Sequence, residues 1–284
     1  MNLFLAVTGR RADSFHDLVS VAAPLDFGDT LRVEARAASG GFSLACDDPA
    51  VPVGEENLVL QAARAFVAAT GWSGGAKFFL EKRIPMGAGL GGGSSDAVAA
   101  LRALNRLAGA PLAEAALAES AARLGSDCAL FLAGAPVVMR GRGERIEALP
   151  PAAAQRLRGR SVLVFKPGFG VATPWAYARM AANPETYVPV ADAEAQLGAW
   201  LADGRRPAEE LLFNNMERVV AKKFLALPAL FDRLRGEFAL APRMSGSGSA
   251  CFALLRDDAP VAAIEARIRD AWGESAFLVR ARLA

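Results

Sequence analysis

The chain has 284 residues and 53% of them are hydrophobic, which is enough apolar material for one large domain or two closely packed ones. Its 32 Lys and Arg residues nearly balance its 30 Asp and Glu residues, so bulk charge indicates neither a nucleic acid nor a membrane as a partner. The cysteines are scattered, there is one histidine, and no apolar run approaches ~18 residues, so we expect a cytoplasmic protein without disulfides or a zinc site.

The first element is a short apolar strand over residues 2–8, and a polar loop over residues 9–16 follows it. This loop contains Phe15 and His16, for which two interpretations stay open. The phenyl ring can pack onto the core with a solvated histidine beside it. Alternatively, the ring stacks on the base of a ligand while the imidazole hydrogen-bonds the edge of that base.

A small sheet and a helix are predicted next. Residues 30–37 alternate as in a strand, and residues 42–46 are expected to form its antiparallel partner. Asn57 stands where an N-cap is expected, before the helical spacing of residues 58–67. The Phe-rich segment 76–84 has the pattern of another strand and leads directly into a glycine-rich loop.

The glycine-rich loop runs from Pro85 to Ser95, between that strand and an alanine-rich helical run. Glycines let backbone N–H groups approach a ligand closely, and a helix start adds unpaired N–H groups and a positive dipole end. The order of strand, loop and helix therefore predicts a phosphate site. At this site Ser94 and Ser95 can cap the helix, and a hydroxyl can bind Mg²⁺.

Three other interpretations of the loop are weaker. The spacing Gly87-x-Gly89-x-x-Gly92 matches a dinucleotide fingerprint, but a second helix follows in place of the strand that this fold requires. A Walker A loop needs a lysine before its hydroxyl residue, and here Gly93 precedes Ser94 directly. A flexible linker would not lie between a Phe-rich strand and an amphipathic helix.

After two helices, Asp127 lies in a Leu-Gly-Ser-Asp turn that precedes the apolar residues 128–132. An aspartate in such a turn can be a cap, or it can be a carboxylate positioned for proton transfer. Both interpretations stay open at this point. A hairpin is predicted over residues 136–149, and the stretch 150–160, which begins with two prolines, is the expected seam between two lobes.

The second half of the chain is predicted to begin with a strand over residues 161–167. Thr173 is a good N-cap, with Pro174 at the first helical position. Further helices are expected over residues 191–201, 207–224 and 227–238. The polar pair Asn214 and Asn215 interrupts that apolar run, and the sequence offers no reason for it.

A second glycine-rich loop contains Gly246, Ser247 and Gly248, and a strand-helix-strand pattern follows it over residues 252–279. This ending indicates a small open sheet with helices on one face, as in a ferredoxin-like fold. We therefore expect an α+β protein of two lobes. The N-terminal mixed-sheet lobe would span residues 1–155 and the C-terminal ferredoxin-like lobe residues 156–284.

The pattern Pro85-x-x-x-Gly89-Leu90-Gly91-x-Gly93-Ser94-Ser95 resembles the phosphate loop of the galactokinase, homoserine kinase, mevalonate kinase and phosphomevalonate kinase superfamily. Over nearly its whole length the chain looks most similar to the kinases that act on 4-diphosphocytidyl-2-C-methyl-D-erythritol in the non-mevalonate isoprenoid pathway. The resemblance implies a two-lobed small-molecule kinase with its active site in the cleft. It also implies ATP and Mg²⁺ as cofactors and, as substrate, an alcohol that carries a cytidine diphosphate group.

The resemblance implies roles for individual residues. Asp127 would be the catalytic base and Ser95 a metal ligand. The residues implied in ATP binding are Asn57, Leu58, Lys82, Pro85, Met86, Gly87, Ala88, Gly89, Leu90, Gly91, Gly92, Gly93, Ser94 and Ser95. The residues implied in substrate binding are Asn2, Phe15, His16, Thr173, Gly246, Ser247 and Gly248, with Phe15 and His16 on the cytosine.

The chain departs from the family pattern in two places. Ser14 and Phe15 stand where the family carries glycine and tyrosine, which preserves stacking but removes any bond that the phenol makes. The family's lysine two residues before Asn2 is absent, and we expect that the chain as given starts late. Two alternatives to the function that the resemblance implies are a homoserine-type or mevalonate-type kinase and a catalytically impaired nucleotide-binding relative. We expect a monomer or a weak homodimer.

Overall fold

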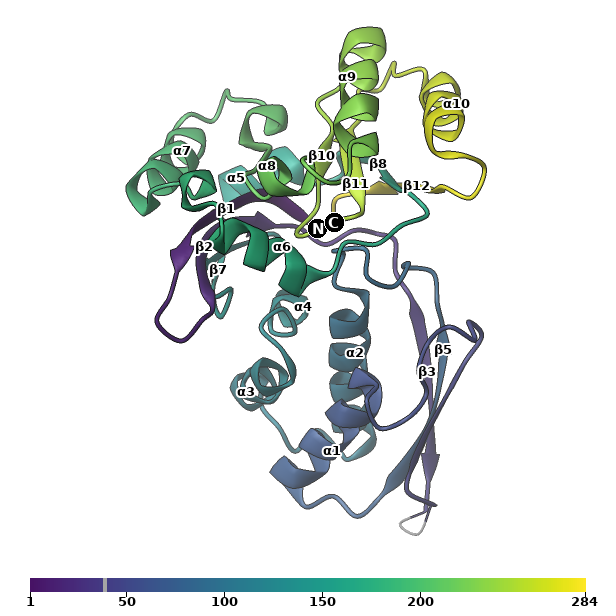
Figure 1. Ribbon diagram of the computed structural model, residues 1–284. Helices are drawn as coiled ribbons and strands as arrows, with labels where there is room; N and C mark the ends of the chain where they lie inside the picture. The colour runs from purple at the N-terminus through teal and green to yellow at the C-terminus, as the bar shows by residue number, and fades with distance from the viewer. Residues whose placement is uncertain (38–39) are drawn as a thin grey trace. The chain divides into compact units, whose positions relative to one another are not determined.

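The computed structural model describes residues 1–37 and 40–284, and these form two compact units (Figure 1). The first unit contains Met1–Phe27, Gly87–Leu90 and Ala135–Ala284, and the second contains Gly28–Met86 and Gly91–Gly134. The division differs from the boundary expected near residue 155. The chain leaves the first unit after its opening hairpin, and it returns to that unit once within the glycine-rich loop and again after residue 134.

A mixed five-stranded sheet forms one layer of the first unit as described. Its members are β1 (Asn2–Arg10), β2 (His16–Ala22), β6 (Val137–Gly141), β7 (Arg145–Ala148) and β9 (Phe213–Asn214). The order is β7-β6-β2-β1-β9, and all neighbours are antiparallel except β1 and β9, which run parallel. Strand β1 is apolar because it is central, and its residues Leu3 to Val7 are almost completely buried.

The second sheet of this unit is antiparallel and has the order β10-β11-β8-β12. Its strands are β8 (Ser161–Lys166), β10 (Arg243–Met244), β11 (Cys251–Leu254) and β12 (Phe277–Arg282). Helices α9 (Ala226–Phe238) and α10 (Val261–Trp272) lie beside each other, and the Trp272 indole donates a hydrogen bond to the Ala226 carbonyl at 3.1 Å. The predicted ferredoxin-like arrangement is confirmed.

One hydrophobic core joins these two sheets. It contains Phe4 of β1, Val164 of β8, Phe252 of β11 and Trp200 of α7 (Val190–Ala202). The stretch 150–160, which we expected to be a seam, forms helix α5 (Pro151–Leu157) and buries Leu157 completely in the same core. Its two prolines suit a helix start rather than a linker, because Pro151 occupies the first helical turn.

The second unit packs helices against a three-stranded sheet. The elements are β3 (Thr30–Arg36), β4 (Phe42–Cys46), β5 (Gly75–Glu81), α1 (Leu58–Thr70), α2 (Gly92–Leu107), α3 (Glu114–Leu124) and α4 (Leu130–Ala133). The predicted pairing of β4 with β3 is wrong, because β5 lies between them, antiparallel to β3 and parallel to β4. Helix α1 supplies the crossover that a parallel pair requires.

The helix predicted over residues 207–224 is also wrong. The segment forms a 3-10 turn η3 (Ala208–Leu211), strand β9 and a short helix α8 (Glu217–Val220). Asn214 and Asn215 interrupt the expected helix, because their side chains form hydrogen bonds with the backbone of other segments. Asn215 accepts from Val7 N at 2.9 Å and donates to the carbonyls of Val7 and Thr186, while Asn214 donates to those of Met244 and Gly246.

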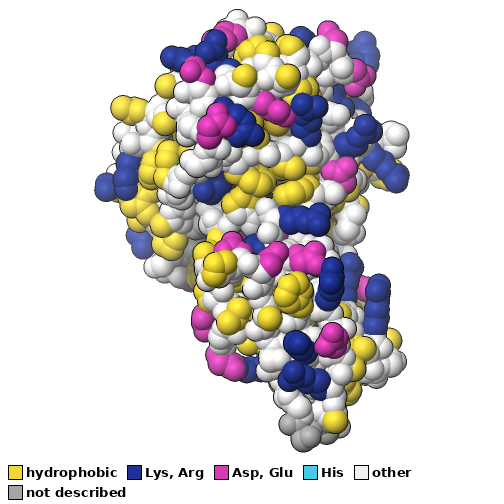
Figure 2. Space-filling view, turned by 90° about the vertical axis from the view of Figure 1, so that its right-hand side faces the viewer, with side chains coloured by type: hydrophobic (Ala, Val, Ile, Leu, Met, Phe, Trp, Pro, Cys, Tyr) yellow, Lys and Arg dark blue, Asp and Glu magenta, His cyan; other side chains and the backbone are white. Residues whose placement is uncertain are grey.

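The remaining elements are α6 (Thr173–Ala181) and the 3-10 turn η2 (Pro184–Thr186). Among the described residues, no helix combines the length and the apolar character that crossing a membrane would require. On the face seen in Figure 2, basic and acidic side chains are interspersed, in keeping with the net formal charge of +2.

We expect Asn215→Ala to reduce the free energy of unfolding by about 3 kcal/mol, because it leaves three buried backbone groups without their partner. Urea unfolding of the first unit, followed by the fluorescence of its buried tryptophan, measures the loss. Glu119→Ala on the exposed side of α3 is the control and should change stability by no more than about 0.5 kcal/mol. Equal stability of the two variants would contradict this account.

Candidate functional site

The predicted phosphate loop ends in a helix whose first turn is uncapped. Helix α2 begins at Gly92, and its N-cap is Gly91 in the left-handed region with φ of 73°. No side chain caps this end, so the expectation that Ser94 and Ser95 cap the helix is wrong. Both serines lie inside the first turn, where the hydroxyl of Ser95 donates to the Gly92 carbonyl at 2.8 Å. The backbone N–H groups of this turn are therefore available to an anion.

The turn that carries Asp127 is followed by residues that pack against this helix start within the second unit. The neighbouring Cys128 is buried in the same core as Val98 of α2, and a Cβ on Gly91 would lie 2.7 Å from the Phe131 ring. These contacts hold the turn that carries Asp127 against the first turn of α2. Surrounding protein desolvates the carboxyl and raises the pKa of Asp127, although the residue keeps access to solvent.

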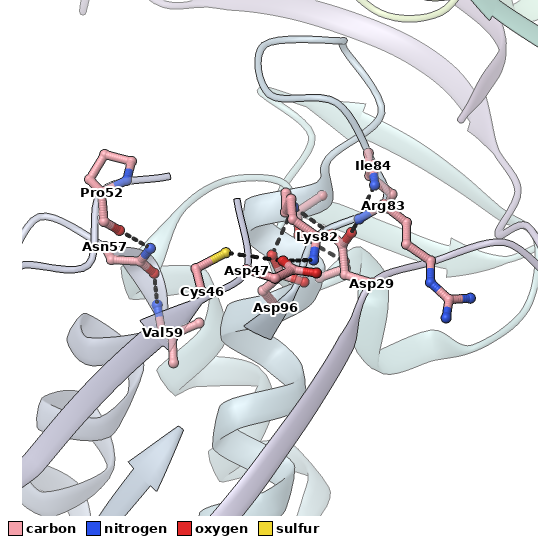
Figure 3. Close-up of polar contacts among 12 residues, drawn as sticks. Asp29, Cys46, Asp47, Pro52, Asn57, Val59, Lys82, Arg83, Ile84 and Asp96 are labelled. Atoms are coloured by element: carbon pink, nitrogen blue, oxygen red, sulfur yellow. Dashed lines mark hydrogen bonds and ion pairs between the residues drawn. The ribbon is translucent and has the colours of Figure 1, made fainter. Parts of the chain in front are cut away.

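Lys82 is buried in an ion cluster at the end of β5. Its ammonium contacts the carboxylate of Asp29 and lies 3.0 Å from that of Asp96, and all three side chains are less than 10% exposed (Figure 3). Asp29 also accepts from the backbone N–H groups of Arg83 and Ile84 at 2.6 and 2.8 Å. The cluster therefore ties the strand before the glycine-rich loop to the helix after it.

The charges in this cluster perturb one another. Burial raises the pKa of Asp96 to about 6, which outweighs the opposite effect of Lys82. Burial also lowers the pKa of Lys82, but its contacts with the two aspartates prevail and the net shift is upward. Lys82 is thus a cation held in place by two carboxylates, beneath Gly92, whose added Cβ would lie 3.0 Å from the ammonium nitrogen.

Asn57 is the N-cap of α1, as predicted. Its side-chain oxygen accepts from Val59 N at 2.9 Å, and its amide donates to the Pro52 carbonyl at 2.6 Å (Figure 3). Leu58 is the first residue of the helix. The proposed contact of these two residues with adenine stays a prediction.

The segment Gly87–Leu90 belongs to the first unit, where it packs against the second glycine-rich loop. The hydroxyl of Ser245 donates to the Gly89 carbonyl at 3.1 Å, and Ala250 N donates to the Ala88 carbonyl at 2.9 Å. A Cβ on Gly89 would lie 2.5 Å from the Ser245 carbonyl oxygen, and φ there is +74°. The two glycine loops that the sequence singled out are therefore in direct contact.

The residues expected near the substrate alcohol lie around the second glycine loop. The Thr173 hydroxyl lies 2.7 Å from that of Ser247, and Asn2 N donates to the Ser245 hydroxyl at 3.2 Å. The Asn2 amide donates to Ser20 at 2.9 Å. Thr173 is not the N-cap that we predicted, since Ala172 occupies that position and no side chain caps α6.

Phe15 and His16 lie in different surroundings although they are adjacent in sequence. The ring of Phe15 is 50% exposed, with the Arg142 guanidinium 4.7 Å from its centroid. The imidazole of His16 is buried, lies 4.7 Å from the Tyr177 ring and is 3.0 Å from the Tyr187 hydroxyl. Ser14 has φ of 68°, which explains why the family carries glycine there.

Sequence reasoning missed Asp29, Asp96, Tyr177 and Tyr187. Asp96 directly follows the serines and lies on the buried face of an alanine-rich helix, which is an unusual place for a carboxylate. Tyr177 and Tyr187 are the only tyrosines of the chain, and both lie beside its only histidine. No sequence signal links Asp29 to Lys82.

Two family models match the chain. GHMP kinases N terminal domain covers residues 57–135, and GHMP kinases C terminal covers residues 201–274. The first match contains the glycine-rich loop and Asp127, and the second contains the loop with Gly246 and Gly248.

Similar proteins indicate a narrower family than these two models do. A 4-diphosphocytidyl-2-C-methyl-D-erythritol kinase from Synechococcus sp. (strain CC9605) is 41% identical over 266 residues, covering 90% of this chain and 85% of the relative. The chain belongs to the 4-diphosphocytidyl-2-C-methyl-D-erythritol kinase family. A family member from Thermus thermophilus is 40% identical, with 97% of this chain and 92% of the relative covered.

Solved structures agree with this assignment. A crystal structure of 4-(cytidine 5'-diphospho)-2C-methyl-D-erythritol kinase matches with a TM-score of 0.77 and 37% identity, covering 100% of this chain and 97% of that one. A mevalonate kinase with a TM-score of 0.69 and 11% identity shares the fold alone. As a member of this kinase family, the chain is an ATP-dependent kinase that acts on an alcohol group, and the predicted family, fold class and enzyme class are confirmed.

We expect Gly89→Ala to destabilise the first unit far more than Gly87→Ala. Both positions have positive φ, which costs about 1–2 kcal/mol for alanine, but a Cβ on Gly87 meets nothing within 4 Å. The Cβ of Ala at position 89 would collide with the Ser245 carbonyl, so we expect an additional loss of at least ~2 kcal/mol. Chemical unfolding of both variants measures the difference, and equal losses would contradict the predicted close contact.

Asp96→Asn should change how stability depends on pH. The folded-state pKa of Asp96 lies above its unfolded value, so its contribution is fully present below about pH 4 and is lost as pH rises through about 6. The stability of the native chain relative to Asp96→Asn should therefore fall by up to about 3 kcal/mol between pH 4 and pH 7. Urea unfolding at several pH values measures this difference, and a constant difference would refute the assignment.

Proposed function

We propose that this chain transfers the γ-phosphoryl group of ATP to a hydroxyl of 4-diphosphocytidyl-2-C-methyl-D-erythritol, a step of the non-mevalonate isoprenoid pathway. The substrate comes from the names of its relatives, which are 39–41% identical in the examples from Synechococcus and Pelotomaculum. The structural observation that supports the proposal is that the segment after Asp127 packs, through Phe131, against Gly91 at the uncapped start of α2. A base and a phosphate-binding helix start are the two groups that phosphoryl transfer to an alcohol needs.

The phosphates would lie at the first turn of α2. Its free N–H groups and the positive end of the helix dipole favour an anion, and the lack of a capping side chain leaves this end open. A Cβ on Gly91 would collide with the Phe131 ring at 2.7 Å, and one on Gly92 would be crowded by Ile84 and Lys82 at 3.0 Å. The backbone can therefore contact the phosphates closely.

Asp127 would accept the proton of the substrate hydroxyl. The hydroxyl oxygen attacks the γ-phosphorus, the bond from that phosphorus to the bridging β-γ oxygen breaks, and ADP leaves with the bond electrons. The raised pKa of Asp127 makes the carboxylate a stronger proton acceptor than an ordinary aspartate. It also means that the base form is lost at a higher pH than for an exposed aspartate.

Ser95 fits the role of a Mg²⁺ ligand. Its hydroxyl donates its proton to the Gly92 carbonyl, so the lone pairs of its oxygen can face a cation. Among the residues described, no group of three or more His, Cys, Asp or Glu side chains could hold a metal ion. This suits Mg²⁺ at kinase sites, which takes few protein ligands and is bound through phosphates, whose charge it neutralises.

The cytidine diphosphate end of the substrate would bind in the first unit. We assign its cytosine to Phe15 and His16, and the alcohol end to Asn2, Thr173 and the loop with Gly246, Ser247 and Gly248. The hydrogen bonds of Asn2 with Ser20 and Ser245 and the contact of Thr173 with Ser247 support a preorganised set of polar groups. We also propose a cytoplasmic protein, because all three cysteines are free.

We expect Asp127→Asn to reduce turnover by at least ~100-fold, because asparagine has the same size but cannot accept the proton. Nucleotide affinity should stay the same, since the helix start that would bind the phosphates is unchanged. ADP release with ATP, Mg²⁺ and 4-diphosphocytidyl-2-C-methyl-D-erythritol measures turnover, and calorimetry with a non-hydrolysable ATP analogue measures affinity.

Glu114→Gln provides the matched control, since it removes one exposed carboxylate at the start of α3. It should leave both turnover and affinity close to those of the native chain. If Asp127→Asn turned over at the native rate, Asp127 would not be the base. If the native chain released no ADP with this substrate, the proposed function itself would be wrong.

A further inference from the structure

The second glycine-rich loop begins at an edge of its sheet. It leaves the short strand β10 at Met244, which is almost completely buried. In the part of the chain that the structure describes, β10 is an edge strand, so one side of its backbone has no neighbouring strand to bond with. Buried backbone groups are costly to leave without partners. Side chains from another segment must therefore satisfy Met244.

The segment 214–217 supplies these side chains. A carboxylate oxygen of Glu217 accepts a hydrogen bond from Met244 N at 2.7 Å. The Asn214 amide donates to the carbonyls of Met244 and Gly246 at 2.8 and 2.9 Å. Asn214 belongs to β9, which pairs with the central strand β1. The start of the loop is therefore attached to the five-stranded sheet through two side chains.

The rest of the loop folds back onto Met244. Gly248 N donates to the Ser245 carbonyl at 2.9 Å, and Ser245 N donates to the Ala250 carbonyl at 2.9 Å. The sulfur of Met244 lies directly against Gly248, because a Cβ there would be 2.5 Å from it. The position of the whole loop therefore follows the position of Met244.

The loop needs this attachment because its backbone is intrinsically free. Gly246 and Gly248 have φ of 58° and 82°, and glycine loses more conformational freedom on ordering than any other residue. If the loop sampled several forms, only a fraction of the molecules could bind the substrate at a given moment. The apparent affinity would fall by that fraction.

The surroundings of Glu217 strengthen its hydrogen bond. Glu217 lines a cavity of about 100 Å³, whose apolar walls include Leu227 and Phe231. Burial raises the pKa of Glu217, although the bond from Met244 N and the charge of Arg243 oppose the shift. Water competes little for a carboxylate that is desolvated in this way, so the bond that it accepts is stronger than one at the surface.

We propose that Glu217 is a positioning residue, which holds the second glycine-rich loop in the form that binds the alcohol end of the substrate. It acts through the N–H of Met244 rather than by contact with the substrate. The inference rests on the proposed function, because that function assigns Gly246, Ser247 and Gly248 to the substrate.

Two substitutions separate the hydrogen bond of Glu217 from its charge. Glu217→Gln and Glu217→Met both remove the negative charge and keep a long side chain. Glutamine retains an oxygen that can accept from Met244 N, whereas methionine lacks this acceptor and suits the apolar walls of the cavity. Glu210→Gln is the control, since it removes an exposed carboxylate from η3.

Hydrogen exchange of the amides of residues 243–250, measured by mass spectrometry, tests the order of the loop without any ligand. We expect exchange at least about tenfold faster in Glu217→Met, as for the loss of a bond to a charged acceptor. Glu217→Gln should exchange at least about threefold more slowly than Glu217→Met, because its neutral bond is about half as strong as the original. Native exchange in Glu217→Met, or equal exchange in the two variants, would overturn the role of Glu217.

ADP release tests the consequence for catalysis. The KM for 4-diphosphocytidyl-2-C-methyl-D-erythritol should rise by about tenfold or more in Glu217→Met, and by less in Glu217→Gln. The KM for ATP should change by no more than about twofold, because the ATP phosphates would lie at α2 in the other unit. A general loss of stability would reduce the amount of active protein and leave both KM values unchanged. An unchanged KM for the substrate, or an equal rise in both KM values, would refute the positioning role.

The two measurements separate this inference from the proposed function. If exchange in Glu217→Met is native while the native chain phosphorylates the substrate, the role of Glu217 is wrong and the proposed function stands. If exchange responds as expected but the native chain releases no ADP with this substrate, Glu217 orders the loop and the substrate assignment is wrong.

Discussion

The contact of Gly89 with the loop that follows Met244 is the constraint on which much of the first unit depends. The two backbones are in contact there, and a Cβ added to Gly89 would lie only 2.5 Å from the Ser245 carbonyl oxygen. The hydrogen bonds from Ser245 and Ala250 hold the contact from the other side. The chain re-enters the second unit at Gly91, two residues after Gly89, and begins there the helix that would bind the phosphates.

Buried polar groups position the rest of the site. Lys82 holds the end of β5 to α2 through Asp29 and Asp96, and Asn215 holds the Thr186 backbone to β1. Such groups add little net stability, since desolvation offsets much of their attraction, but each satisfies partners that would be costly to leave alone. These groups act mainly by fixing positions, because an ion cluster or an amide that makes several hydrogen bonds at once holds the bonded segments in one arrangement.

The sequence predicted the elements that depend on local pattern. Strand β1, the N-cap at Asn57, the hairpin of β6 and β7 and the order of strand, glycine loop and helix all follow from periodicity and glycine chemistry within a few residues. It failed where a distant partner overrides the local signal. Thr173 has the side chain of an N-cap but meets Ser247 instead, and residues 207–224 have helical spacing but are broken by asparagines that bond to other segments.

The sequence by itself determined the family, because the family pattern rests on residue types at short spacing, and through that resemblance it predicted the phosphate loop and the role of Asp127. Only the tertiary structure decided that Asp29 neutralises Lys82 from 53 residues away and that Tyr187 meets His16 across 171 residues. The tertiary structure alone also decided the order β3-β5-β4 of the strands in the second unit's sheet. Such contacts are set by how the layers pack, and burial and hydrogen bonding between distant segments leave no periodic trace in the chain.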